Sequence, residues 1–143
     1  MVNNKMRIQF DAKSQNESFA RSVIACFVLQ LNPSIAEVSD IKTAVSEAVT
    51  NSIVHGYKNS QSGEITMEAS LCQDVIHINI YDNGIGINDV DKALEPFYTT
   101  CPEDERSGMG FSIMQSFMDE VKVVSKKGCG TKVYMAKKIK TNA

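Results

Sequence analysis

Glu47, Asn51 and His55 follow one another at intervals of four residues. In a helix this spacing places the three side chains in a line along one face. A carboxylate in such a line can act as a general base, and an amide oxygen suits a hard cation such as Mg²⁺. A solvated polar face would show the same spacing, so the line by itself leaves both interpretations open.

Six of the eight glycines fall in three Gly-x-Gly pairs. Glycine adopts positive φ and lets a ligand lie close to the backbone. The first pair closes the run Asp-Asn-Gly-Ile-Gly at 82–86, where Asp82 could accept a hydrogen bond from an exocyclic amine. A plain turn is the alternative, because Asp-Asn-Gly is favoured wherever the chain needs positive φ.

The second pair belongs to Arg-Ser-Gly-Met-Gly-Phe at 106–111 and leads into an expected helix. Backbone N–H groups at a helix start, beside an arginine, form an anion site suited to phosphates. A glycine-rich loop end with a solvated arginine is the alternative. The run is not a Walker A loop, since Gly-x-x-x-x-Gly-Lys-Ser/Thr is absent, and no parallel βαβ unit surrounds it as in a Rossmann fold.

The third pair, in Gly-Cys-Gly-Thr at 128–131, could be a hairpin turn alone. His77 lies in an expected strand and is interpreted as a packed or edge residue. The cysteines at 26, 72, 101 and 129 are far apart and form no metal-binding pattern, so reduced thiols are expected.

The elements that must position these residues follow from apolar periodicity. Ser14-x-x-Glu17 and Ser34-x-x-Glu37 have the form of capping boxes that open two helices. The apolar seam of the second helix includes Ser52. The 26 residues from Asp82 to Ser107 lack periodicity, and loops of that length are usually functional. The expected elements are a strand over 6–10, helices over 15–31 and from 34 to about 56, a hairpin of 65–71 and 76–80, a helix from about 108, and a hairpin of 121–125 and 131–136. This order predicts an α+β fold, a two-layer α/β sandwich with the helices on one sheet face.

The chain length and the net charge limit the possible functions. The 143 residues predict one domain, 1–143, too small for a bilobal protein kinase. The net charge of -2 argues against direct nucleic-acid binding, and the basic residues after Glu120 are interpreted as a solvated strand and tail. The longest apolar run, over 23–29, is too short to span a membrane, and no signal segment is recognisable, so a cytoplasmic protein is expected.

Taken together, Glu-x-x-x-Asn, Asp-x-Gly-x-Gly, Gly-x-Gly-Phe and Gly-Thr resemble the N box, G1, G2 and Gly-Thr motifs of the GHKL ATP-binding superfamily. The segments 14–21, 46–57 and 105–114 resemble the anti-sigma-F factors of sporulating bacteria, which are small serine-protein kinases that also bind sigma factors. Anti-sigma kinases of the general stress response share these motifs. The resemblance spans almost the whole chain and implies a Bergerat fold with a mixed, mostly antiparallel sheet.

The resemblance also implies roles for individual residues. Glu47 would be the general base, Asn51 would hold Mg²⁺, and Arg106 would stabilise the γ-phosphate of ATP. Asp82 would bind the adenine amino group, supported by Thr131. The remaining ATP or ADP contacts would come from His55, Gly84, Gly86, Thr99, Thr100, Ser107, Gly108, Met109, Gly110 and Phe111.

Two protein partners are implied as well. One is a sigma factor of RNA polymerase, sequestered by a homodimer through the first helix and the sheet, with Arg21 in the contact. The other is an anti-anti-sigma protein of the STAS type that supplies the acceptor serine. The alternatives are a general-stress anti-sigma kinase and a non-catalytic, nucleotide-dependent anti-sigma protein. Two other classes are not expected. An ATPase that drives conformational work would need a transducer domain, and a histidine kinase would need a phosphoacceptor helix.

Overall fold

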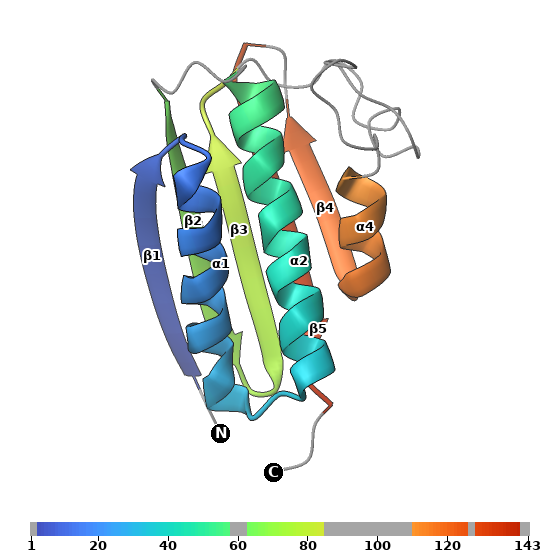
Figure 1. Cartoon of the computed structure of the whole chain (residues 1–143). Coiled ribbons are helices and arrows are strands. Elements are labelled where there is room, and N and C mark those ends of the chain that lie inside the picture. Colours follow the sequence, from blue (N-terminus) through green and yellow to red (C-terminus); the bar gives the residue numbers. More distant parts are fainter. Residues whose placement is uncertain (1–2, 58–62, 85–109, 126–127, 141–143) are drawn as a thin grey trace.

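The computed structural model describes residues 3–57, 63–84, 110–125 and 128–140 (Figure 1). These residues form a five-stranded sheet in the order β1-β2-β3-β5-β4. The strands are β1 (Asn3–Asp11), β2 (Glu64–Cys72), β3 (Val75–Asp82), β4 (Glu120–Ser125) and β5 (Thr131–Lys138). The helices α1 (Gln15–Val28), α2 (Ile35–Asn51) and α4 (Gly110–Phe117) lie side by side on one face of the sheet (Figure 1). The α+β sandwich is therefore confirmed.

All four pairings between the described strands are antiparallel, so these strands do not form the mixed sheet that the resemblance implied. In the register, Asp82 lies opposite both Ile65 and Thr131, and Thr131 lies opposite Ser125. Side chains alternate between the two faces of a sheet. This register therefore brings Asp82, Thr131 and Ser125 together at one end of the sheet, on the face that the helices cover.

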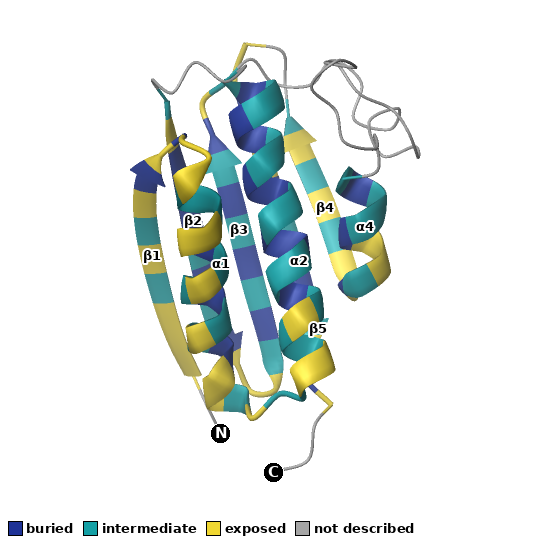
Figure 2. Ribbon diagram, viewed as in Figure 1, coloured by how far each residue is buried: buried dark blue, intermediate teal, exposed yellow. Residues whose placement is uncertain are grey.

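The core fills the space between the sheet and α2, which packs against α1 on one side and α4 on the other (Figure 2). Alternating apolar residues supply the inner face of each strand, as their period of two predicts. The side chains with no exposed surface include Ile24, Ile41, Val45, Ile65, Met67, Ile76, Ile78, Met114 and Met135. None of the helices in the described ranges is long and apolar enough to cross a bilayer.

The two expected capping boxes differ in outcome. At α2, the Glu37 N–H donates to Ser34 Oγ at 3.1 Å and the Ser34 N–H donates to Glu37 Oε1 at 2.8 Å. At α1, Ser14 has helical dihedrals and makes no side-chain capping bond, so this box was wrongly predicted. Glu17 instead accepts a hydrogen bond from Ser46 Oγ and pairs with Arg21, which fastens α1 to α2.

Both long helices end in a turn that is not α-helical, which the apolar periodicity did not predict. α1 ends at Val28 and is followed by a 3₁₀ turn, Leu29–Leu31, that closes at Asn32 with φ 53°. α2 continues into a π-helical turn, Ser52–Gly56, so its helical path ends at the expected residue. The Tyr57 N–H donates to the Ser52 carbonyl at 2.9 Å, five residues back. His55 therefore lies in the π turn and not in the α-helix that carries Glu47 and Asn51.

Candidate functional site

Asp82, the last residue of β3, is 4% exposed and lies at the centre of the candidate site. Ser52 Oγ donates to its Oδ2 at 2.7 Å, and the Gly84 N–H donates to its Oδ1 at 2.8 Å. Burial raises the pKa of Asp82, although the hydrogen bonds from Ser52, Gly84 and Thr131 act in the opposite direction. The result is a buried acceptor, held in place by donors on two other segments of the chain.

Backbone packs directly on backbone beside this carboxylate. A Cβ added to Gly84 would overlap the carbonyl oxygen of Gly56, and a Cβ on Gly56 would lie 3.0 Å from Asp82 Oδ1. The π turn after α2 and the loop after β3 are therefore in contact, and both glycines are needed for this close approach. Glycine at both positions therefore lets backbone, and not side chains, lie next to the Asp82 carboxylate.

The Gly-Thr motif closes the same end of the sheet. Gly130 has φ +81°, and a Cβ there would overlap the Asp82 carbonyl oxygen. Thr131 is 5% exposed, and its Oγ1 lies 2.8 Å from Ser125 Oγ. Asp82, Gly84 and Thr131, which the sequence analysis assigned to one site, are thus brought together by the structure.

Two residues that support this site were not predicted to do so. Ser52 is buried, as its place in the apolar seam predicts, but its hydroxyl also donates to Asp82. Tyr57 had no expected role, and its hydroxyl donates to the Glu64 carbonyl and accepts from the Asn83 N–H, both at 2.7 Å. Burial raises the pKa of Tyr57, so the hydroxyl keeps its proton at neutral pH. The only signal in the sequence for the role of Ser52 was that this residue places a hydroxyl group in the apolar seam near the end of the helix.

Glu47 lies at a second part of the site, between α2 and α4. A Cβ added to Gly110, the first residue of α4, would lie 3.4 Å from Glu47 Oε2. The Gly110 end of α4 and the Glu47 carboxylate therefore face each other. Asn51 ends α2 and His55 lies in the π turn, and both are half-buried. Phe111 is 7% exposed and belongs to the core.

The other predicted site residues fall outside the described part of the chain. They are Gly86, Thr99, Thr100, Arg106, Ser107, Gly108 and Met109. Within the described part, no group of three or more His, Cys, Asp or Glu residues could hold a metal ion by itself. A cation bound through Asn51 would need further oxygen ligands from a substrate, which is how Mg²⁺ is usually held at phosphates.

Solved structures share this fold at low sequence identity. The RsbU and RsbW domains of a Mycobacterium tuberculosis protein superpose with a TM-score of 0.67 at 18% identity, covering 95% of this chain and 32% of that one. The catalytic domain of the histidine kinase ThkA gives 0.61 at 13% identity, covering 94% and 96%. Full-length ShkA in complex with AMPPNP gives 0.60 at 16% identity, covering 96% and 32%.

Sequence relatives are much closer. The model of the histidine kinase-like ATPase domain matches residues 10–137. An anti-sigma F factor of Clostridium perfringens is 55% identical over 140 residues, covering 98% of this chain and 100% of the relative. Another from Halalkalibacterium halodurans is 53% identical over 136 residues, covering 95% and 93%. With its fold and motifs, the chain therefore belongs to the histidine kinase-like ATPase domain family and, within it, to the anti-sigma F factors.

Proposed function

We propose that this chain is an anti-sigma factor that binds and inhibits the sporulation sigma factor sigma-F. We further propose that it is an ATP-dependent serine kinase that phosphorylates and inactivates an anti-anti-sigma protein of the STAS type. The observation that carries this proposal is the 55% identity to an anti-sigma F factor over that protein's full length. The arrangement at Asp82, Thr131 and Glu47 supports it, because a buried acceptor lies in the sheet and a carboxylate that could act as a base lies on α2.

The adenine would bind at the Asp82 end of the sheet. A buried carboxylate that is already fixed by two donors can accept a further hydrogen bond from an amino group with little rearrangement. Thr131 supports the same edge. The close backbone contact of Gly84 with Gly56 leaves no side chain between the ligand and the carboxylate.

Phosphoryl transfer would take place at the Glu47 end. Bound ATP and Mg²⁺ supply a transferable phosphoryl group whose charge is partly neutralised, and Asn51 would hold the cation. Glu47 would receive the proton of the acceptor serine hydroxyl while the serine oxygen bonds to phosphorus and the bond to ADP breaks. Arg106 would stabilise the charge on the transferred group.

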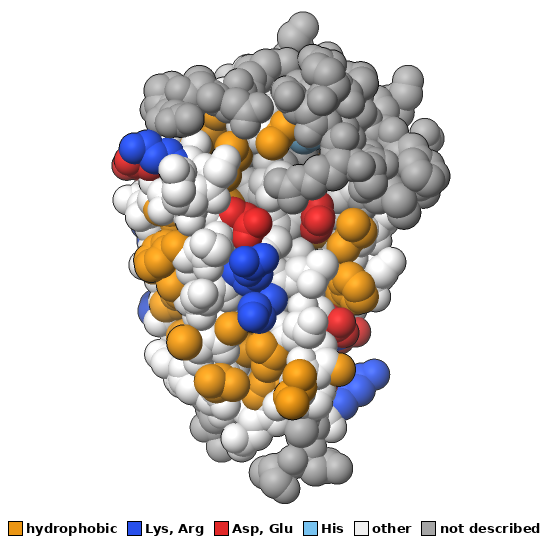
Figure 3. All heavy atoms as spheres, in the orientation of Figure 1, with side chains coloured by type: hydrophobic (Ala, Val, Ile, Leu, Met, Phe, Trp, Pro, Cys, Tyr) orange, Lys and Arg blue, Asp and Glu red, His pale blue; other side chains and the backbone are white. Residues whose placement is uncertain are grey.

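The sigma factor would bind across the exposed faces of α1 and the sheet. Phe19, Leu29 and Ile35 are large apolar residues that are 49%, 57% and 90% exposed. Figure 3 shows apolar side chains spread over α1 and the start of α2, with basic side chains near the centre of the same face. Arg21 on α1 is half-exposed, and we assign it to the sigma contact. The working form would be a cytoplasmic homodimer.

The test is a transfer assay with radiolabelled ATP, Mg²⁺ and a STAS-type anti-anti-sigma protein. Label on the partner supports the kinase, and its loss with a partner whose acceptor serine is replaced by alanine establishes the acceptor. Release of free phosphate alone would contradict the kinase and favour an ATPase. Sigma-F binding with no label on any protein would favour the non-catalytic anti-sigma protein.

A further inference from the structure

Lys137 is a lysine on the covered face of the sheet, where its neighbours are apolar. It lies in β5 opposite Ile76, and its side chain is only 13% exposed. A buried ammonium group is costly unless it is paired and hydrogen-bonded. The proposed chemistry of the nucleotide site makes no use of it, so its position needs another explanation.

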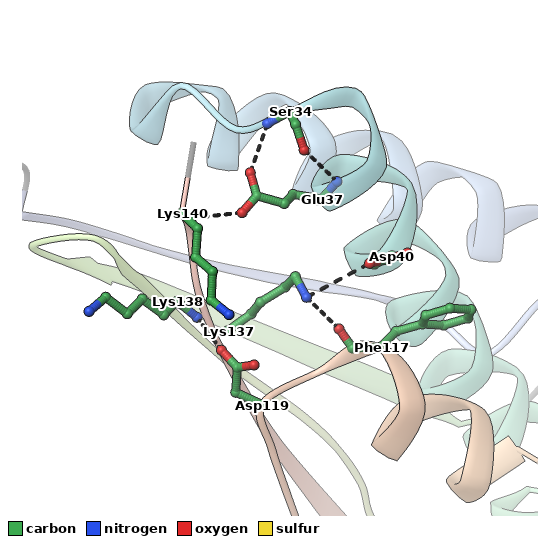
Figure 4. A network of polar contacts seen from close by, with 8 residues as sticks. All are labelled: Ser34, Glu37, Asp40, Phe117, Asp119, Lys137, Lys138 and Lys140. Carbon is green, nitrogen blue, oxygen red and sulfur yellow. Dashed lines mark hydrogen bonds and ion pairs between the residues drawn. The ribbon is translucent and has the colours of Figure 1, made fainter. Parts of the chain in front are cut away.

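The Lys137 ammonium joins three elements (Figure 4). It donates to the carbonyl oxygen of Phe117, the last residue of α4, at 2.7 Å. It also lies 3.8 Å from Asp40 Oδ2 on α2. A cation at the C-terminal end of a helix satisfies an open carbonyl and interacts favourably with the helix dipole. One side chain of β5 thus holds α2 and the end of α4 at a fixed separation.

The residues beside Lys137 hold the link between α4 and β4 through the backbone. The Asp119 N–H donates to the Ala136 carbonyl at 2.9 Å, and the Lys138 N–H donates to Asp119 Oδ2 at 2.7 Å. These two bonds fasten the link to the sheet without the Lys137 side chain. Lys137 adds a polar connection between α4 and α2 to the apolar packing of the two helices, so its loss loosens the Phe117 end of α4 while the sheet pairing remains.

This connection bears on Glu47 through the geometry of the two helices. Asp40 precedes Glu47 by seven residues in α2, and Phe117 follows Gly110 by seven residues in α4. Seven residues of α-helix span about 10 Å. Figure 1 shows that the Gly110 end of α4 lies toward the end of α2 and its Phe117 end toward the start, so the helices run in opposite senses. Lys137 therefore links α2 and α4 at Asp40 and Phe117. Glu47 and Gly110 lie about 10 Å further along the same two helices.

We infer that Lys137, with Asp40 as its partner, is a positioning residue that sets the separation between Glu47 and the Gly110 end of α4. This inference rests on the proposed kinase function only for its effect on turnover. The adenine end of the site, at Asp82 and Thr131, lies on β3 and β5, whereas only the further nucleotide contacts assigned to Gly110 and Phe111 lie on α4. Loss of Lys137 should thus impair phosphoryl transfer more strongly than it weakens the binding of ADP.

The experiment compares Lys137→Met with Lys138→Met, the neighbouring lysine on the opposite face, which is 61% exposed and 3.8 Å from Asp74. In Lys137→Met we expect kcat to fall at least about tenfold, since misplacement of reacting groups by about 1 Å can cost on the order of 100-fold. The Kd for ADP should change by a much smaller factor than kcat. Lys137→Arg, which keeps the cation, should recover most of kcat, and Lys138→Met should match the wild type.

Hydrogen exchange gives a readout that needs no catalysis. The amides of 114–117, which donate to carbonyls in the first turn of α4, should exchange faster in Lys137→Met than in Lys138→Met, while those of β3 stay protected. Asp40→Asn, which leaves the Phe117 bond in place, should shift kcat and exchange in the same direction by a smaller amount. It replaces Lys137→Met if that variant does not fold.

Two results would overturn the inference. One is equal exchange and equal kcat in the Lys137 and Lys138 variants. The other is a parallel loss of kcat and ADP affinity, which would indicate general destabilisation. If the wild type itself transfers no phosphate, the proposed kinase function fails, but the exchange comparison still decides whether Lys137 couples α4 to α2.

Discussion

Asp82 is a carboxyl group in a place where burial disfavours its charged form and so raises its pKa. Because burial raises its pKa, the folded chain keeps a proton that the unfolded chain has released, over an interval that begins near pH 4. Across this interval the contribution of Asp82 to the free energy of unfolding falls as pH rises. A group that costs stability at neutral pH is more easily explained by ligand binding than by folding.

We therefore expect Asp82→Asn to weaken ADP binding by about 10- to 100-fold, the range for loss of a charge-assisted hydrogen bond. The variant should also lack the part of the pH-dependent fall in stability that Asp82 causes. Calorimetric titration with ADP and urea unfolding at several pH values measure the two effects. An unchanged ADP affinity would show that adenine binds elsewhere.

At Glu47, the carboxylate faces the first residue of α4 and is proposed to receive the proton of the acceptor serine. We expect Glu47→Gln to abolish transfer to the STAS partner while ATP binding largely survives, because the amide cannot take up the proton. Glu68→Gln is the control, since Glu68 is a half-exposed carboxylate that pairs with Arg7 on β1. Transfer by the Glu47 variant at the wild-type rate would remove Glu47 from the mechanism.

At the scale of elements, the strands and hairpins were predictable because alternating apolar residues have one way to face a core. Asp82 and Thr131 could be grouped because Asp82 closely follows one expected strand and Thr131 begins another. The π turn could not be predicted, since no residue type specifies i+5 bonding. The bond to Asp82 from Ser52, the first residue of this turn, was therefore missed. Ser14 failed as a cap because Glu17 bonds to α2 instead.

The contact between the π turn and the loop after β3 gives a prediction at this scale. Gly84→Ala should force these segments apart, because its Cβ would overlap the Gly56 carbonyl oxygen, and overpacking of this kind costs about 1–3 kcal/mol. Gly128→Ala is the matched control. Gly128 has φ +82° with nothing within 4 Å of its Cβ position, so its variant carries only backbone strain of about 1–2 kcal/mol.

Urea unfolding should show both glycine variants to be less stable than the wild type. Only Gly84→Ala should also lose affinity for ADP, because only that substitution moves the loop beside Asp82. Equal ADP affinity in the two variants would mean that the contact between these segments stabilises the fold without shaping the site.

For the whole molecule, one core joins the sheet to all three described helices, so the nucleotide site and the fold are expected to melt together. A ligand that binds only the folded state adds free energy by mass action, about 2.7 kcal/mol at a concentration of 100 times Kd. ADP should accordingly raise the Tm of the wild type in a concentration-dependent way. The same excess of ADP should raise the Tm of Asp82→Asn much less, since its Kd is higher.

The Tm measured with and without Mg²⁺ distinguishes the phosphate end of the site from the adenine end. If Asn51 and the phosphates share the cation, chelation of Mg²⁺ should reduce the stabilisation by ATP and ADP but leave that by adenosine, which has no phosphate, unchanged. Asn51→Ala should abolish the difference between nucleotide with and without Mg²⁺. A thermal shift with adenosine that depends on Mg²⁺ would contradict this division, because the adenine end at Asp82 and Thr131 contains no proposed cation ligand.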